Sequence, residues 1–426
     1  MKNLVIIDGV RTPFSKINTG LGGCSAVDLG RSTVNALVAK TGIDPAIVDE
    51  TIFGCVCQPA DAANIARVIA LRAGIPESQP ALTVHRNCAS GLEAIAAAHA
   101  RMNTGNGEVF IVGGTESMSQ APLLFNPSAA KKFTTLSRAR TPGHKLAAAA
   151  EFRPADFLPL VALKLGLTDP VADLNMGETA ELLAREWNIS REEQDAFALR
   201  SHKKAHAAHD LIAEEIAPVY LPNGLPPVLD DNGPRENQSL DALTNLKPVF
   251  QKKHGTITAG NASQITDGAV ALLVMSEERA HTLGLEPLGR LLACRSAGCD
   301  PARMGLGPAH AIAKTIELDG LHPDGADIIE INEAFAAQVL AVVKALASES
   351  FAHESLHHHR PICEIPEEKL NRQGGAIALG HPVGATGARL VLTALRQLHR
   401  DPFARRALVS LCIGGGQGSA AWIEKP

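Results

Sequence analysis

The sequence predicts an α/β protein built from two similar halves that are separated by a long insertion. Short apolar runs rich in β-branched residues alternate with longer alanine-rich amphipathic stretches, which is the pattern of buried strands connected by helices. The same order of elements returns after residue 285, so we interpret the chain as an internal duplication. With 426 residues, the chain is long enough to bury a large core.

The first half is predicted to contain four strands and two helices. The strands are residues 3–8, 50–56, 81–85 and 108–114, and the helices are residues 26–42 and 90–105. Each helix ends at a glycine, Gly42 or Gly105, as a left-handed C-cap requires.

The second half repeats this order. It has predicted strands at 287–298 and 326–335, a glycine-rich turn that opens a helix at 374–395, and a strand with a glycine-rich turn at 406–424. We therefore assign residues 1–117 and 251–278 to an N-terminal half, residues 118–250 to an inserted loop domain, and residues 279–426 to a C-terminal half.

The insertion differs in character from both halves. It is basic and punctuated by prolines, and it ends in a polar stretch at 223–240. Long insertions in α/β domains commonly carry ligand contacts or an oligomer surface, so we expect a binding lid here. Within it, residues 152–165 suit a lid, a partner helix or a membrane-surface contact. Their apolar spacing equally suits a buried helix face, which is the interpretation we favour.

The composition argues against several classes of protein. The formal net charge of −5 provides no electrostatic attraction to nucleic acid or to an anionic membrane. The first 14 residues are typical of a strand and turn rather than a signal peptide, and no apolar stretch approaches the roughly 20 residues of a membrane-spanning helix. We therefore expect a soluble, cytoplasmic protein. The eight cysteines are scattered without paired CxxC spacing, so we expect a reducing compartment. The three histidines at 357–359 are interpreted as a solvated loop rather than a metal site.

Cys88 is the first candidate for chemistry. It lies in the segment 86–91, where a predicted strand gives way to a helix. A cysteine at a helix N-terminus faces unpaired backbone N–H groups and the positive end of the helix dipole, which lower the thiol pKa. Position alone leaves a nucleophile and a buried structural cysteine as equal alternatives.

His381 occupies the matching place in the second half, within the glycine-rich segment 374–384. Pro382 fits the first turn of a helix, so the histidine is held at a fixed turn. In a duplicated fold this places His381 near Cys88 across the pseudo-twofold axis. A histidine beside a cysteine activates the thiol for attack, although a lone His381 would be an ordinary turn residue.

Two further segments carry candidate residues. Cys412 ends a predicted strand, and the glycines 414–416 supply N–H groups that can stabilise an oxyanion. Beside a histidine, a desolvated Cys412 can act as acid or base; the alternative is a tight turn with a core thiol. Asn332 follows an apolar strand, where its amide can hold a water at a reacting oxygen or simply cap the next helix.

Taken together, these segments resemble the thiolase family over essentially the whole chain. Six segments carry the resemblance: NCASG at 87–91, MGETAE at 176–181, HGTITAGNASQITDGAVALLVMS at 254–276, NEAFA at 332–336, GHP at 380–382 and CIGGG at 412–416. The resemblance implies the duplicated thiolase fold, in which two βαβαβαββ-type halves form a five-layered αβαβα arrangement. It also implies an acyl-CoA:acetyl-CoA C-acyltransferase.

The resemblance implies a role for each candidate residue. Cys88 takes the acyl group from a 3-ketoacyl-CoA or from acetyl-CoA, and His381 activates it. Cys412 exchanges a proton with the methyl carbon of acetyl-CoA. One oxyanion site is formed by His381 with a water held by Asn332, and the other by the N–H groups of Cys88 and Gly414.

The resemblance also implies where coenzyme A lies. It should lie over residues 259–263, with Ser263 near the pantetheine, while Met176, Met304 and Phe335 line the reactive end. Coenzyme A and acetyl-CoA are substrates, and neither a metal nor a tightly bound cofactor is implied.

Two extra segments indicate a subfamily. Residues 348–371 lengthen the spacing from Asn332 to His381, and they and residues 151–181 resemble the β-subunits of fatty-acid-oxidation trifunctional complexes. This implies a homodimer or homotetramer, with a hydratase/dehydrogenase subunit as a further partner. That subfamily usually carries histidine at the position of Asn332, so the asparagine weakens the inference of a long-chain substrate and of that partner.

Two other functions remain as alternatives. Ketoacyl synthases share the duplicated architecture and the cysteine nucleophile, but they decarboxylate a malonyl thioester with two histidines, and Cys412 speaks against that class. A thiolase-fold protein that binds acyl-CoA or a partner without catalysis would be expected to lack one of the three reactive side chains, and all three are present.

Overall fold

The computed structural model describes residues 2–426, and its backbone is organised around one mixed sheet of ten strands. The strand order is β4-β3-β5-β10-β1 in one half and β11-β14-β13-β12 in the other, with the short β2 paired to β10. The halves join through the short antiparallel pairing of Val5 with Arg290 and Ile6 with Gly289. Each half therefore contributes its own part of the sheet, and the two parts, called the first and second sheets below, meet at β1 and β11.

The first half runs β1-α1-β3-α2-β4-α3-β5 before the chain leaves the sheet and returns as β10. The bounds are β1 Leu4–Arg11, β2 Ser15–Lys16, α1 Ala26–Thr41, β3 Glu50–Gly54, α2 Ile65–Arg72, β4 Ala81–Val84, α3 Ser90–Asn103, β5 Val109–Glu116 and β10 Thr266–Ser276. Helix α1 begins at a Ser25 capping box and ends at Gly42, whose φ of 65° is left-handed as predicted. Helix α3 ends at Asn103, two residues before Gly105, whose φ is 77°.

The second half repeats this order, which confirms the predicted duplication. The bounds are α11 Glu277–Leu283, β11 Gly289–Gly298, α12 Gly307–Asp319, β12 Ile328–Ile331, α13 Ala336–Leu346, α14 Glu349–Ser355, α15 Ala376–Leu379, α16 Val383–Arg400, β13 Arg406–Ile413 and β14 Gln417–Glu424. Where the first half has β4, the second half has an isolated parallel bridge between Ile329 and Leu370. Helix α16 therefore corresponds to α3, and the hairpin β13-β14 to β5 and β10.

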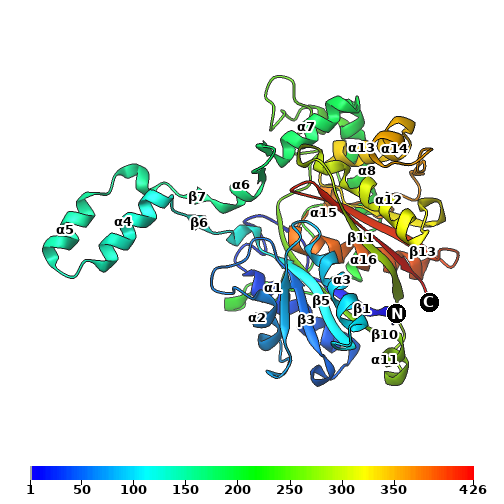
Figure 1. Ribbon diagram of the computed structural model, residues 1–426, viewed down its shortest axis with the longest axis horizontal. Coiled ribbons are helices and arrows are strands. Elements are labelled where there is room, and N and C mark those ends of the chain that lie inside the picture. The colour runs from blue at the N-terminus through cyan, green and yellow to red at the C-terminus, as the bar shows by residue number, and fades with distance from the viewer. Residues whose placement is uncertain (1) are drawn as a thin grey trace.

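The helices form layers on both sides of the two sheets (Figure 1). Helices α1 and α2 cover the outer face of the first sheet, α12 and α13 cover the outer face of the second, and α3 packs against α16 between them. The two central helices approach closely because small residues face each other. A Cβ added at Gly91 would lie 2.8 Å from the backbone nitrogen of Ala388, and one at Gly387 would lie 2.6 Å from that of Leu92. This contact aligns the first turns of α3 and α16.

Between β5 and β10 the chain makes a long excursion, within which the predicted insertion 118–250 falls. Its elements are β6 Leu123–Leu124, α4 Pro127–Arg138, α5 Pro142–Ala150, β7 Leu160–Val161, α6 Ala162–Gly166, β8 Thr168–Asp169, β9 Leu174–Asn175, α7 Met176–Glu186, α8 Arg191–Ala207, α9 His209–Ala213 and α10 Leu240–Thr244. Its far end is fastened to β1 by Arg11, whose guanidinium donates two 2.7 Å hydrogen bonds to buried Asp231.

Residues 121–167 form an arm that reaches away from the body (Figure 1). A small aromatic cluster holds its helices together, with the Phe133 ring 4.8 Å from the rings of both Phe125 and Phe152. The interpretation of residues 152–165 as a buried helix face is wrong: Phe157 is 56% exposed and Leu158 is 67% exposed. Apolar spacing alone does not distinguish a face packed on the body from one that projects from it.

None of the helices in the described residues is both long and apolar enough to span a bilayer.

Candidate active site

Cys88 stands where β4 ends and α3 begins. The preceding residue, Asn87, has a left-handed φ of 42°, which turns the chain sharply before the helix. The Asn87 side chain donates a 2.7 Å hydrogen bond to the carbonyl of Gly414, so the turn before α3 is fastened to the turn between β13 and β14. Cys88 and Gly414, which are far apart in the sequence, are thereby brought together.

The half-buried Cys88 lines a partly open, apolar cavity of about 310 Å³. Its walls come from both halves of the fold, from Leu163 and Leu167 at the base of the arm, and from Val171 in the segment that follows the arm. Met176, at the start of α7, also lines it. The cavity is suited to an apolar group attached to the sulfur of Cys88.

Burial raises the pKa of the Cys88 thiol. This is the opposite of the lowered pKa that its position at a helix N-terminus predicts. The backbone N–H groups of Gly414 and of Cys88 itself lower the pKa of the thiol, as predicted, but burial outweighs them. Cys88 therefore needs a base to become a thiolate at neutral pH.

His381 lies immediately before α16, whose first turn packs on that of α3. Pro382 is the N-cap of α16 rather than part of its first turn. The Nδ1 atom of His381 is 2.6 Å from the Thr386 hydroxyl, which donates its own hydrogen to the carbonyl of Pro382 at 3.0 Å. Because that hydroxyl hydrogen is used, Thr386 accepts from Nδ1–H, and Nε2 carries a free lone pair.

His381 is neutral over the physiological pH range. Burial, assisted by the charge of Arg389, lowers its pKa to about 3. The Asn332 amide lies 3.4 Å from Nε2, in an orientation that suits a weak N–H donor. A neutral imidazole whose Nε2 is engaged only by this long contact can accept a proton from a thiol brought to it.

Asn332 is fully buried just after β12. It does not cap the following helix, because the N-cap of α13 is Phe335. Its Oδ1 atom finds no hydrogen-bond partner among the residues described. A buried amide oxygen of this kind is normally satisfied by water or ligand.

Cys412 lies near the end of β13 and is 1% exposed. Its pKa is raised well above the ordinary value by burial, and further by the proximity of Cys88. It packs in one cluster with Met304 and Phe335, and half-buried Met176 packs against that cluster. The structure thus gathers three of the four predicted binding residues around the second thiol.

The fourth, Ser263, lies half-buried in the loop before β10. This loop is fastened to the Asn332 segment, since the Ser263 N–H donates to the carbonyl of Ala334 at 2.9 Å and Ala262 forms a β-bridge with Phe335. The predicted loop 259–263 therefore runs along the edge of the cluster around Cys412.

Sequence reasoning missed three residues that hold these groups in place. Asn87 fastens Gly414 to the Cys88 turn, Thr386 sets the tautomer of His381, and Glu116 binds the start of α16. Two of them could have been found from the sequence, because Asn87 adjoins Cys88 and Glu116 is a carboxylate at the end of a predicted buried strand. Thr386 gave none, because its role depends on where the ring of His381 lies.

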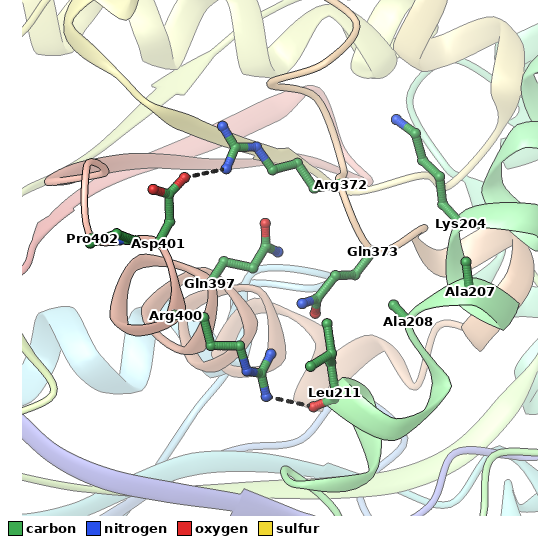
Figure 2. Close-up of a pocket in the computed structure, with 10 residues that line it drawn as sticks. All are labelled: Lys204, Ala207, Ala208, Leu211, Arg372, Gln373, Gln397, Arg400, Asp401 and Pro402. Carbon is green, nitrogen blue, oxygen red and sulfur yellow. Dashed lines mark hydrogen bonds and ion pairs between the residues drawn. The ribbon is translucent and has the colours of Figure 1, made fainter.

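A larger cavity of about 580 Å³ lies at the opposite end of α16 from His381 (Figure 2). Three cationic side chains line it, and all three bind protein groups: Arg372 pairs with Asp401 at 3.1 Å, Arg400 donates to the carbonyl of Leu211 at 2.8 Å, and Lys204 donates to the carbonyl of Leu370 at 2.9 Å. None of the candidate catalytic residues lines it. We therefore take the cavity beside Cys88, rather than this one, as the candidate active site.

Within residues 2–426, no three His, Cys, Asp or Glu side chains are grouped so as to hold a metal ion.

A duplicated α/β fold that gathers a thiol, a neutral histidine and a second thiol is suited to cysteine-dependent acyl transfer. Comparison with known proteins agrees. The model of the thiolase N-terminal domain matches residues 4–278, and that of the thiolase C-terminal domain matches residues 285–425.

Two curated relatives extend over the whole chain. The 3-ketoacyl-CoA thiolase of Serratia proteamaculans (strain 568) is 38% identical over 424 residues, covering 99% of this chain and 96% of the relative. The probable acetyl-CoA acyltransferase of Staphylococcus aureus (strain COL) is 40% identical over 430 residues, covering 100% of both.

Solved structures are similar over the same length. Bacillus anthracis acetyl-CoA acetyltransferase has a TM-score of 0.86 at 36% identity, covering 100% of this chain and 99% of that one. Human mitochondrial 3-ketoacyl-CoA thiolase in complex with CoA has a TM-score of 0.85 at 35% identity, covering 100% and 98%. The chain belongs to the thiolase family. It is an acyltransferase, as predicted, and it has the duplicated thiolase fold.

Proposed function

We propose that this enzyme cleaves 3-ketoacyl-CoA with coenzyme A, and catalyses the reverse condensation, through an acyl thioester on Cys88. One observation carries the proposal: Cys88 and Gly414 line the same apolar cavity, and the backbone N–H of Gly414 acts on the Cys88 thiol in the direction that favours its ionised form. The same N–H can stabilise the oxyanion that forms when a thioester or ketone is attacked at that sulfur.

In the first half-reaction, Cys88 gives its proton to Nε2 of His381, and its sulfur attacks the 3-keto carbon. The N–H groups of Cys88 and Gly414 stabilise the resulting oxyanion. The bond between the 2- and 3-carbons then breaks, and its electron pair forms the enolate of acetyl-CoA, stabilised by protonated His381 and a water held by Asn332. Cys412 protonates the methyl carbon, so acetyl-CoA leaves and Cys412 becomes a thiolate.

In the second half-reaction, coenzyme A gives its thiol proton to Cys412 and attacks the thioester on Cys88. The acyl-CoA product leaves with the new carbon–sulfur bond. The released Cys88 thiolate takes back the proton held by His381, which restores all three groups. The structure suits this order of steps. His381 is neutral at rest and can accept a proton, and both thiols have raised pKa values, so they start protonated.

Coenzyme A is the substrate that we assign to the loop 259–263, with Ser263 beside the pantetheine and with Met176, Met304 and Phe335 around the reactive end. Support comes from the packing of these three side chains about Cys412.

The rival functions fit the site less well. A ketoacyl synthase needs a second histidine at the enolate oxygen, where this chain has buried Asn332. A binding protein without catalysis would not need two thiols and a histidine fixed in one tautomer by Thr386.

The cavity beside Cys88 favours acyl chains longer than acetyl. Leu163, Leu167 and Val171 give it an apolar wall, and each buried methylene is worth about 0.8 kcal/mol. We expect CoA-dependent cleavage of 3-ketohexadecanoyl-CoA to be faster than that of acetoacetyl-CoA, measured by loss of the 3-ketoacyl thioester absorbance. Leu167→Trp should fill the cavity and lower kcat/KM for the long substrate by about 10-fold or more, with little change for acetoacetyl-CoA.

Activity confined to acetoacetyl-CoA would contradict the long-chain assignment and make the enzyme a short-chain thiolase. Absence of activity on both substrates, at the level of Cys88→Ala, would overturn the catalytic role and favour a binding function.

We also propose a homo-oligomer in the cytoplasm, in which the arm contacts a second copy. All eight cysteines are free, as suits a reducing compartment. Residues 121–167 contain seven Lys or Arg and two Asp or Glu, a net charge of +5, and since the whole chain is at −5, the rest carries −10. A basic, apolar arm is therefore complementary to an acidic body of another copy.

Light scattering coupled to size exclusion should give a dimer or tetramer, and Leu158→Asp, at an exposed position of the arm, should shift it toward smaller species. A monomer at micromolar concentration would contradict the homo-oligomer. If Leu158→Asp does not change the mass of the oligomer, the arm does not take part in the interface between copies. The arm would then be available to another partner, such as a hydratase/dehydrogenase subunit, and mixing the two proteins would detect that complex.

A further inference from the structure

Glu116, the last residue of β5, is a fully buried carboxylate close to the reactive groups. One oxygen accepts the Cys57 N–H at 2.8 Å and the Cys55 thiol at 3.7 Å. The other accepts the Val56 N–H at 3.0 Å and the Gly384 N–H at 2.9 Å. Every group that it contacts is a donor, so Glu116 holds two separate segments by its two oxygens.

The first segment is the start of α16. This helix is preceded by Pro382, whose side chain cannot accept a hydrogen bond, so the helix has no cap of its own. Glu116 from the other half of the fold supplies the missing acceptor at Gly384, at the end of the helix where a negative charge is favourable. Gly384 lies three residues after His381.

Backbone packing makes this contact rigid. A Cβ added at Gly384 would lie 2.9 Å from the Glu116 carboxylate and 3.0 Å from Cα of Cys55. One added at Gly114, on β5, would lie 1.9 Å from the carbonyl oxygen of Gly384. The strand and the helix start therefore touch through backbone atoms, and a small displacement of either would move the other.

The second segment is a wall of the reaction cavity. Val56 and Cys57 line the same cavity as Cys88, and so does Val383 from the first turn of α16. One carboxylate thus joins the cavity wall to the helix that begins just after His381.

We propose that Glu116 is a positioning residue: it holds the first turn of α16, and with it His381, in fixed register against Cys88 and the wall formed by residues 55–57. The inference rests on the roles proposed above for Cys88 and His381. Glu116 reaches the reacting atoms only through the segments it holds, so it is not itself a catalytic residue.

This arrangement has a consequence for the pH dependence. Burial raises the pKa of Glu116 to about 7. The titratable groups facing it are the thiols of Cys55, Cys57 and Cys88, and burial raises the pKa of each, so all three stay neutral near pH 7. As the pH falls through about 7, Glu116 takes up a proton. An O–H hydrogen then replaces one of the lone pairs that accept from the surrounding N–H groups, and the negative charge at the start of α16 is lost. At least one contact breaks, and the register of α16 loosens.

The test is the pH profile of kcat for the wild type, Glu116→Gln and Glu116→Asp. Glutamine has the same shape but one acceptor oxygen fewer, so we expect kcat to fall about 10- to 100-fold at pH 8 with KM changed less than about 3-fold, as misplacement of a reacting group by about 1 Å would cause. The wild type should lose activity below about pH 7, whereas the low activity of Glu116→Gln should be flat from pH 6 to 8. Glu116→Asp keeps the charge but is one methylene shorter, and it should combine a lower kcat with an acid limb.

Glu50→Gln is the matched control, because Glu50 is a buried glutamate of the same sheet that pairs with Arg101 away from the cavity; its profile should be that of the wild type. An acid limb that persists in Glu116→Gln would overturn the inference. That limb would point to another group such as Glu330, whose pKa burial also raises to about 7 and which binds Gln397 near the far end of α16. Wild-type kcat in Glu116→Gln would overturn it as well.

If Glu116→Gln does not fold by circular dichroism, the comparison of Glu116→Asp with Glu50→Gln decides, and equal kcat values would reject the positioning role. Cys88→Ala separates this inference from the proposed function, because activity retained in Cys88→Ala would sink the catalytic assignment whatever Glu116 does.

Discussion

Cys88→Ala should lower kcat by about 10³-fold or more without loss of folded protein, because the acyl group then has no sulfur to which it can be transferred. The change removes one partly buried thiol that donates no hydrogen bond in the structure, and alanine is compatible with the turn into α3. Cleavage of 3-ketoacyl-CoA measures the rate, and intact mass after incubation with acetyl-CoA measures the covalent intermediate. The wild type should gain one acetyl group and the variant none.

Cys294→Ala is the control for general loss of a thiol, since Cys294 is also half-buried but lies on β11, outside the reaction cavity. Its rate and its acetylation should match those of the wild type. If Cys88→Ala is still acetylated, or if Cys294→Ala is inactive, the nucleophile has been assigned to the wrong cysteine.

His381→Ala should lower kcat by about 10²- to 10⁴-fold at pH 7.5, the range typical of removing a general base. The reason is that burial raises the pKa of the Cys88 thiol, so without Nε2 of His381 little thiolate forms. The loss should shrink as the pH rises toward and above 9, because the thiol then ionises without a base. The wild type should show no such dependence from His381, whose pKa of about 3 keeps it neutral throughout.

The rate of Cys88 alkylation by iodoacetamide, followed by mass spectrometry between pH 6 and 10, isolates this effect from substrate binding. His310→Ala is the matched control, because His310 also has a pKa lowered by burial but packs on Phe351 away from the cavity. Equal alkylation rates for His381→Ala and the wild type at pH 7 would show that Cys88 is activated by other groups.

The fold was predictable because each strand and helix has a recognisable pattern of apolar residues in the sequence. The strands at 50–54 and 109–116 are buried along their whole length and therefore appear as continuous apolar runs. The repeat of these runs after residue 285 indicated the duplication. Since α3 and α16 hold equivalent places in the two halves, residues that open them, Cys88 and His381, were expected to meet.

Other features could not be read from local pattern. The apolar residues 157–165 have a spacing that suits a buried helix, and only the path of the chain shows that Phe157 and Leu158 project from the arm. Leu163 and Leu167 from the same region instead line the cavity beside Cys88. Exposure depends on which distant surface lies opposite a residue, and a short sequence window does not contain that surface.

By itself, then, the sequence determined the order of elements and the duplication, and it predicted which side chains react, since these depend on periodicity and on residue type at helix starts. The three-dimensional packing determined the ionisation and alignment of those side chains. Burial reverses the pKa shift expected for Cys88, Thr386 sets the tautomer of His381, and Glu116 caps a helix in the other half. Desolvation and hydrogen bonds between distant segments are properties of the folded environment, and they arise only when both halves are in contact.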